Sequence, residues 1–181
     1  MFIVKSLLHA TGRHGRIAFI IALLVFTAIY IPQHFIVTPI LGNVWGFLLS
    51  LFFFTLNCYM LYCLFARRLH DMGRSVWAFM AMITLELGVI ITTMMAFGGA
   101  EYFSAFAVYD RKDEIPQEVR DEIISTYQAT LEAHHTQTAI IFWIVPVLFC
   151  LWLAIAKGDA GENKYGAAPA PVSGAITASK I

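Results

Sequence analysis

The chain has 181 residues, of which 59% are hydrophobic and only 13% are charged, with a mean hydropathy of +0.71. Soluble domains carry about twice that share of charged residues, so the composition argues against a soluble protein and indicates a membrane protein. Twelve basic and twelve acidic residues cancel in number, but they are unevenly distributed along the chain, and that distribution predicts a topology.

Four segments are long and apolar enough to span a bilayer, which takes about 20 residues because roughly 30 Å must be crossed at about 1.5 Å per residue. The first covers about residues 17–37, and Pro32, Gln33 and His34 are expected to mark its outer end. A secretory signal would need a small-residue cleavage site, which the residues after Tyr30 do not offer. We therefore expect an uncleaved first transmembrane helix.

The other three spans are expected at about residues 44–66, 76–97 and 139–156. Gly98 and Gly99 are placed to end the third span, because glycine commonly terminates helices. The three cysteines lie inside apolar runs, where a free thiol behaves as a small hydrophobic group, so we expect no disulfide. The sequence predicts an all-α membrane protein, a four-transmembrane-helix bundle.

Between the third and fourth spans lies an outer loop, residues 98–138. Within it, apolar residues recur every four positions: Ile115, Val119, Ile123, Tyr127 and Leu131. This spacing predicts an amphipathic helix lying on the membrane or on the other extramembrane loop.

The basic residues predict the orientation, because lysine and arginine are enriched in cytoplasmic loops. Nine of the twelve lie before the first span, between the second and third spans, or after the fourth, at Lys5, Arg13, Arg16, Arg67, Arg68, Arg74, Lys157, Lys164 and Lys180. The outer loop has three basic residues against eight acidic ones. The sequence therefore predicts a multi-pass protein of a bacterial inner (plasma) membrane with its amino and carboxyl termini in the cytoplasm. Residues 170–181 are expected to be a disordered tail.

Three polar motifs lie on the predicted cytoplasmic side. They are Gly-Arg-His-Gly-Arg at 12–16, Arg-Arg-Leu-His-Asp-Met-Gly-Arg-Ser at 67–75, and a tail motif at 158–166 marked by Gly158, Gly161, Asn163, Tyr165 and Gly166. This combination resembles the DUF805 family of small bacterial inner-membrane proteins, which includes the YhaH-like proteins. The resemblance implies that residues 1–169 form one membrane domain of unestablished biochemical function.

Seven residues near these motifs are candidates for binding an anionic lipid headgroup or a partner: Arg13, Arg16, Arg67, Arg68, His70, Asp71 and Arg74. Guanidinium groups hold phosphate through two parallel hydrogen bonds. The alternative interpretation is that the arginines only determine topology, with Arg74 pairing locally with Asp71 and Gly73 ending the helix of the second span. Nucleic acid is not an expected partner, because a duplex would meet anionic lipid before it met these residues.

No cluster in the sequence amounts to a catalytic apparatus. His70 and Asp71 are neighbours, as are His134 and His135, and adjacent side chains on a helix point about 100° apart. The tail does not fit a calcium loop, because Lys164 occupies the position that needs glycine. We therefore expect no catalytic residue, no metal and no cofactor.

Glu86 is the one acidic residue inside a predicted span, about 15 Å from the start of that span. An ionisable group at that depth is costly unless it is protonated or partnered. Asn57 lies at nearly the same depth in the neighbouring span, so we predict that Glu86 faces Asn57 inside the bundle. The pair is either an interhelical hydrogen bond that fixes packing or part of a proton or ion relay.

Three functions follow from these observations. The first is a structural or interaction protein whose basic face binds membrane lipid, a protein partner or another copy of the chain. The second is a small oligomeric transporter or channel that uses Glu86, although the spans contain few other polar residues. The third is an interfacial lipid-modifying enzyme, for which a nucleophile or metal set is lacking. The first is the hypothesis we favour.

Overall fold

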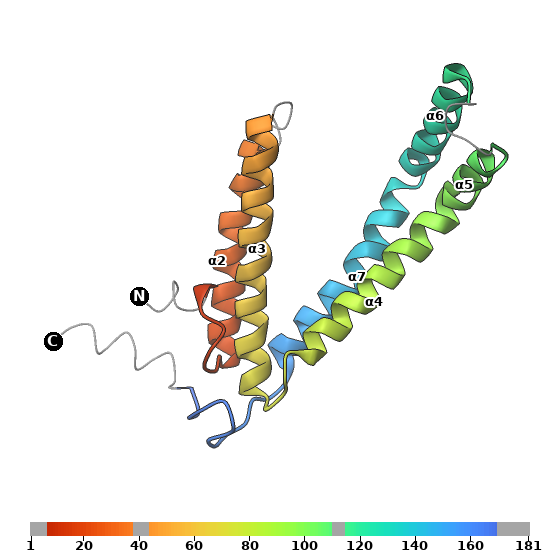
Figure 1. Cartoon of the computed structure of the whole chain (residues 1–181). Coiled ribbons are helices and arrows are strands. Elements are labelled where there is room, and N and C mark those ends of the chain that lie inside the picture. The colour runs from red at the N-terminus through yellow and green to blue at the C-terminus, as the bar shows by residue number, and fades with distance from the viewer. Residues whose placement is uncertain (1–6, 38–43, 110–114, 170–181) are drawn as a thin grey trace. The chain divides into compact units, whose positions relative to one another are not determined.

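The computed structural model describes residues 7–37, 44–109 and 115–169. Over these ranges the protein is built from helices and contains no β-strand (Figure 1). The elements are α2 (Arg16–Val37), α3 (Val44–Asp71), α4 (Trp77–Met94), a π-helical turn η2 (Met95–Gly99), α5 (Ala100–Ala107), α6 (Gln117–Ala133) and α7 (His135–Ile155). Four helical segments are long and apolar enough to cross a membrane, which confirms the predicted all-α membrane fold. The predicted disordered tail, residues 170–181, lies outside the described residues.

The helix boundaries differ from the predicted spans mainly by being longer. α2 continues through Pro32 to Val37, so the polar group expected to mark its outer end is helical. α3 runs beyond the predicted end at Ala66 as far as Asp71, which places the first part of the arginine motif on its last turns. α7 begins at His135 rather than Ala139. Hydropathy finds the apolar part of a helix, but main-chain hydrogen bonds extend each helix past the apolar residues.

The third span does not end at its glycines as predicted. Phe97 and Gly98 leave helical geometry, and Gly98 adopts a φ of 95°, a conformation that favours glycine. The chain then resumes as α5, so residues 100–107, which the sequence placed in a loop, are helical. A single residue with positive φ kinks this helix but does not stop it, because alanine and other helix-compatible residues follow.

The chain divides into two compact units, residues 1–80 with 150–181, and residues 81–149. The first unit is held together by α2 packing beside α3 (Figure 1). Phe19 of α2 is fully buried, with its ring 6.1 Å from that of Phe65 on α3. Ala18 and Ala22 are also buried, and small side chains let membrane helices approach closely. The core of this unit therefore lies where α2 begins and α3 ends.

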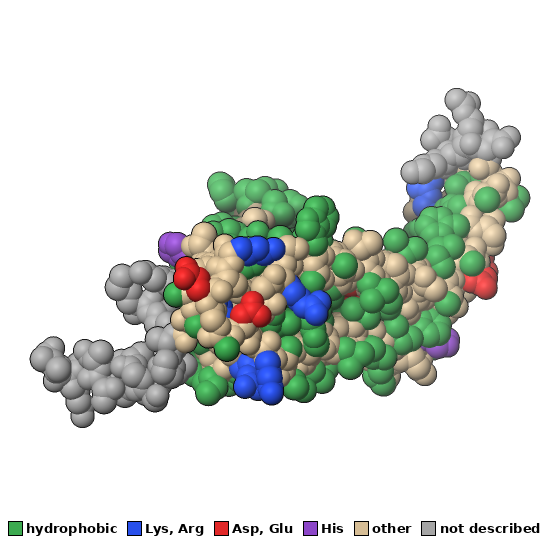
Figure 2. All heavy atoms as spheres, turned by 90° about the horizontal axis from the view of Figure 1, so that it is seen from below, with side chains coloured by type: hydrophobic (Ala, Val, Ile, Leu, Met, Phe, Trp, Pro, Cys, Tyr) green, Lys and Arg blue, Asp and Glu red, His purple; other side chains and the backbone are tan. Residues whose placement is uncertain are grey.

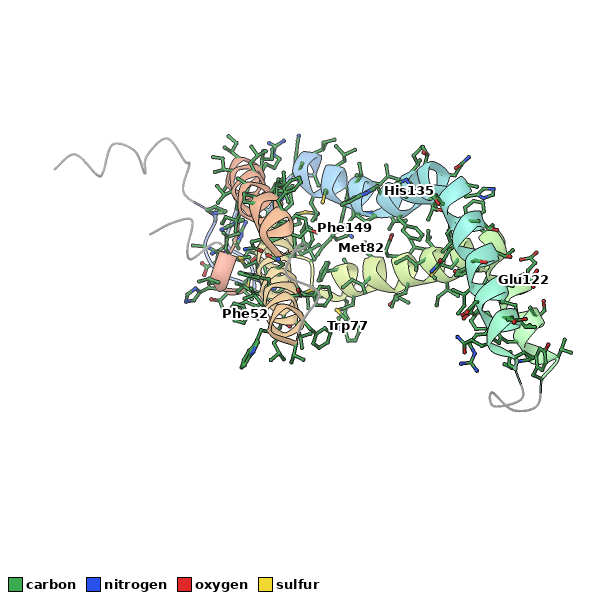
Figure 3. All side chains as sticks on the ribbon, turned by 90° about the horizontal axis from the view of Figure 1, so that it is seen from above. Phe52, Trp77, Met82, Glu122, His135 and Phe149 are labelled. Atoms are coloured by element: carbon green, nitrogen blue, oxygen red, sulfur yellow. The ribbon has the colours of Figure 1, made fainter. Side chains whose placement is uncertain are left out.

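The second unit contains the predicted amphipathic helix, and α6 confirms it. The apolar residues Val119, Ile123 and Tyr127 are half-buried, whereas Asp121 on the other side is exposed. α6 packs against α5 and η2, and Figure 3 shows α6, labelled at Glu122, lying against α5. The predicted helix therefore packs against the continuation of the third span.

Large apolar side chains stay exposed along the four candidate spans, among them Leu24, Phe54, Trp77, Ile91 and Leu148. A soluble monomer rarely exposes contiguous apolar surface on this scale. In a bilayer the same side chains face hydrocarbon, which is the solvent that this surface fits.

Candidate functional site

The end of α3 is shaped by a glycine cap. Gly73 has a φ of 65°, its N–H donates to the carbonyl of His70 (3.1 Å), and the N–H of Arg74 donates to the carbonyl of Leu69 (2.9 Å). These two bonds define a Schellman motif, which satisfies carbonyls that would otherwise lack a partner at a helix end. The prediction that Gly73 ends this helix is confirmed. The cap fixes the direction of the last turn, which carries Arg68 and Asp71.

Asp71 lies between two buried arginines. Its Oδ1 accepts from Nη2 of Arg13 (3.2 Å), and its Oδ2 accepts from Nη1 of Arg68 (2.5 Å). All three side chains are at most 4% exposed. Burying charge is costly unless partners compensate it, and one carboxylate cannot neutralise two guanidinium groups. The remaining guanidinium hydrogens must therefore find other acceptors.

Main-chain carbonyls of the tail supply those acceptors for Arg13. Its Nη1 donates to the carbonyls of Gly161 (2.6 Å) and Gly166 (3.1 Å), and its Nη2 donates to the carbonyl of Asp159. Nη2 also lies 3.4 Å from the carbonyl oxygen of Asp71. A residue that precedes the first span thus holds the segment that follows the last one.

Arg68 makes the equivalent connection to the end of α7. Its Nε donates to the carbonyl of Leu153 (2.7 Å), and its Nη2 donates to the carbonyl of Ala156. Its Nη1 also donates to the carbonyl of His14 (3.2 Å). Carbonyls in the last turn of a helix lack intrahelical donors and carry partial negative charge, so a cation satisfies both needs.

The tail motif folds into a tight turn on the same cluster. Asn163 and Gly166 exchange two main-chain hydrogen bonds, and the side-chain amide of Asn163 donates to the carbonyl of His70 (2.9 Å). The ring of Tyr165 stacks on that of His70, with centroids 3.8 Å apart and planes 12° apart. Asp159 joins the turn by donating its N–H to the carbonyl of Asp71 (2.7 Å). We call this assembly, Arg13, Arg68, Asp71 and residues 158–166, the clasp.

His14 lies beside the clasp and is 1% exposed. Burial, together with the charges of Arg67 and Arg68, lowers its pKa from 6.5 to about 4. The imidazole is therefore neutral at physiological pH. The clasp thus accommodates two buried guanidinium groups and excludes a third positive charge.

The predicted headgroup-binding residues divide into three groups by burial. Arg13, Arg68 and Asp71 are buried and bonded to protein groups, whereas Arg16 and Arg74 are exposed. Arg67 and His70 are half-buried. The expected local pairing of Arg74 with Asp71 is wrong: Asp71 pairs with Arg13 and Arg68, and the guanidinium of Arg74 lies 5.2 Å from the ring centroid of Trp152. The Schellman turn directs Arg74 away from the last turn of α3.

Asn57 has a hydrogen-bond partner that the sequence did not indicate. Its Nδ2 donates to Oε1 of Gln33 on α2 (2.9 Å), which joins α2 to α3. Gln33 was expected to mark the outer end of the first span, but α2 continues past it to Val37, and its side chain lies opposite Asn57. The predicted pairing of Asn57 with Glu86 would join the two compact units and stays a prediction.

Sequence reasoning also missed His14 and the carbonyls that bind the arginines. Backbone acceptors carry no residue signature, although the glycines of the tail motif mark where a main chain approaches another group. Within the described ranges no group of three or more His, Cys, Asp or Glu side chains is placed to hold a metal ion. What the clasp can do chemically is hold three separate segments together through buried charge.

Comparison with known proteins supports a single family. Residues 7–108 match the model of the family described as "Protein of unknown function (DUF805)", and this range includes Arg13, Arg68 and Asp71. No curated protein and no solved structure matches the chain. The tail motif and the predicted domain limit at residue 169 lie beyond the matched range and stay predictions. Because the match covers more than half of the chain, the protein belongs to the DUF805 family, as the resemblance of its motifs predicted.

Proposed function

We propose that the protein is a structural or interaction protein of the bacterial inner membrane, and that its clasp supports a basic cytoplasmic surface that binds anionic lipid headgroups. The observation that carries this proposal is the division of the basic residues. Arg13 and Arg68 are buried and donate hydrogen bonds to groups inside the protein. Four basic residues around the clasp are instead exposed: Arg16, Arg74, Lys157 and Lys164. We call these four residues the basic rim.

The clasp supports the proposed topology. Arg13 precedes the first span, Asp71 ends the second, and Asp159 follows the fourth, yet the three are in direct contact. Segments in contact lie on one side of a bilayer, so an even number of spans brings the chain back to the side where it began. The nine basic residues on these segments favour the cytoplasm as that side.

The basic rim fits a membrane surface better than it fits a soluble anion. Figure 2 shows lysine and arginine side chains spread around this end of the molecule, with acidic side chains between them. Two exposed acids, Asp159 and Glu162, leave the rim with two excess positive charges. Such a diffuse distribution does not form a pocket for one phosphate. Near an anionic leaflet each exposed lysine or arginine contributes about 1 kcal/mol of attraction.

Arg74 carries a further indication of an interfacial position. Its guanidinium lies over the indole of Trp152, an arrangement that stabilises the cation and leaves its edge available to acceptors. Tryptophan favours the membrane–water boundary. The pair therefore supports an interfacial position for Arg74, near the lipid phosphates.

The test compares lipid retention in two double variants that each remove two positive charges. Arg16→Ala with Lys157→Ala changes the basic rim, and Arg111→Ala with Lys112→Ala changes the outer loop. The full chain, in nanodiscs of mixed phosphatidylglycerol and phosphatidylcholine, is released and analysed by native mass spectrometry. We expect the rim variant to retain less phosphatidylglycerol than the wild type, and the outer-loop variant to retain as much.

Thermal unfolding of both variants serves as the control for folding, because the substituted rim residues are exposed. Equal phosphatidylglycerol retention by the wild type and the rim variant would contradict headgroup binding. The exposed arginines would then act only as topology determinants.

A further inference from the structure

A second site candidate lies in the other compact unit, where the kinked third span meets α6. A cavity of about 450 Å³ opens there between η2, α5 and α6. Its lining includes Phe97, Glu101, Tyr102, Glu122, Tyr127 and His134, all from residues 81–149. The volume is within the range of small-molecule pockets.

Aromatic contacts give this cavity fixed walls. The rings of Tyr102 on α5 and Tyr127 on α6 lie 4.9 Å apart, and Phe97 stacks on His134 with centroids 4.7 Å apart. Gly98 makes the approach of α6 possible, because a Cβ at that position would lie only 3.1 Å from the side chain of Thr130. The cavity is therefore bounded by packed side chains from three elements.

The lining combines hydroxyl groups of tyrosine and threonine, which donate and accept hydrogen bonds, with acidic side chains that carry negative charge. Glu101 and Glu122 contribute carboxylates, and no lysine or arginine belongs to the lining among the residues that the structure describes. Nδ1 of His134 lies 2.9 Å from the carbonyl oxygen of Thr130. Since a carbonyl only accepts, Nδ1 donates this hydrogen bond, which fixes the orientation of the ring at the edge of the cavity.

Two carboxylates and aromatic walls together select a particular ligand. A cation with N–H donors gains charge-assisted hydrogen bonds from the carboxylates and attraction from the aromatic faces. An anion would meet two negative charges. We propose that this cavity binds a ligand bearing a primary ammonium group.

Two sources can present that group at this cavity. One is the headgroup of an ethanolamine phospholipid, and the other is a free amine such as a polyamine. The inference does not depend on the basic rim, because none of the lining residues belongs to it.

The first experiment titrates the purified full chain with spermidine by isothermal calorimetry, using Glu101→Gln with Glu122→Gln as the site variant. Glu118→Gln with Glu132→Gln is the matched control, because it removes two exposed acids that do not line the cavity. Loss of both carboxylates should weaken amine binding by about tenfold or more, whereas the control should bind as the wild type does. Glu101 also lies in the first turn of α5, so melting temperatures of all three proteins are measured alongside.

The second experiment measures, by native mass spectrometry, whether the chain retains phosphatidylethanolamine over phosphatidylcholine, whose ammonium has no N–H donor. Preferential retention that the site variant loses identifies the lipid headgroup as the source. Spermidine binding without lipid preference identifies a free amine. The proposal is overturned if neither probe binds, or if the site variant and the matched control bind both probes equally.

Discussion

The main chain at Gly158 lies so close to the side chain of Asp71 that a Cβ added at Gly158 would overlap the carboxylate. Gly158→Ala should therefore displace a carboxylate that two buried arginines hold in place. We expect a loss of about 1–3 kcal/mol in the free energy of unfolding, the usual cost of overpacking. The measurement is thermal or denaturant unfolding of the purified protein. Gly161→Ala is the matched control, because a Cβ there meets nothing within 4 Å, and equal losses in both variants would contradict the contact.

Replacing the carboxylate of Asp71 should lower the free energy of unfolding more than Gly158→Ala does. Asp71→Asn keeps the shape of the side chain but leaves two buried guanidinium groups without a counter-charge. Removal of one member of a buried ion pair typically costs about 3–5 kcal/mol. Glu162→Gln, which neutralises an exposed acid of the same tail, should change stability by less than about 0.5 kcal/mol. Similar unfolding midpoints for the two variants would show that Asp71 does not hold the clasp together.

Stability should fall in acid because of His14. The unfolded chain takes up a proton at this residue below its ordinary pKa of 6.5, whereas the folded chain does so only below a pKa of about 4. The unfolded state therefore binds more protons between these values, and stability decreases as the pH falls through this window. The loss is at most about 3 kcal/mol, at about 1.4 kcal/mol for each pKa unit.

The His14 prediction is checked by unfolding the wild type and His14→Asn at pH 7.5 and 4.5. The carbonyl of His14 accepts from Arg68 through the main chain, so that bond survives the substitution. We expect the wild type to lose more stability than the variant between the two pH values. Parallel losses would assign the acid sensitivity to other groups.

The kink of the third span should depend on Gly98. An alanine there would carry a side chain at a φ of 95° and would place its Cβ 3.1 Å from Thr130. We expect Gly98→Ala to destabilise the packing of α6 by about 1–3 kcal/mol and to raise hydrogen exchange in α5 and α6. Gly88→Ala, in α4 with open space around its Cβ, should leave exchange unchanged or lower it. Unchanged exchange in the Gly98 variant would mean that α6 packs without the kink.

The spans and the amphipathic α6 could be predicted because hydropathy and four-residue spacing are recorded directly in the side chains. The ends of the helices could not. α3 continues through Arg67 and Arg68 to Asp71, since charged side chains do not interrupt main-chain hydrogen bonding when they find partners elsewhere. Gly98 and Gly99 produced a kink where a helix end was predicted, because the residues that follow still favour a helix.

The sequence singled out the residues that form the clasp, but it did not indicate the contacts between them. Arg13, Arg68, Asp71 and the tail motif all belong to the clasp, and their motifs pointed to one side of the membrane. The acceptors of the arginines are mostly main-chain carbonyls, such as those of Leu153 and Gly161. Every residue carries such a carbonyl, so the sequence does not mark which ones accept. Local spacing suggested that Arg74 would pair with Asp71, but Asp71 pairs with Arg68, three residues before it, and with Arg13 from the segment before the first span.

The clasp also imposes an order on the folding of the chain during its synthesis. Arg13 is synthesised before any span, whereas the carbonyls of Asp159, Gly161 and Gly166 leave the ribosome only after the last span. Until then both guanidinium groups must remain hydrated, because burying them without acceptors would be too costly. A nascent chain therefore keeps this end of the molecule open until residues 158–166 have been synthesised.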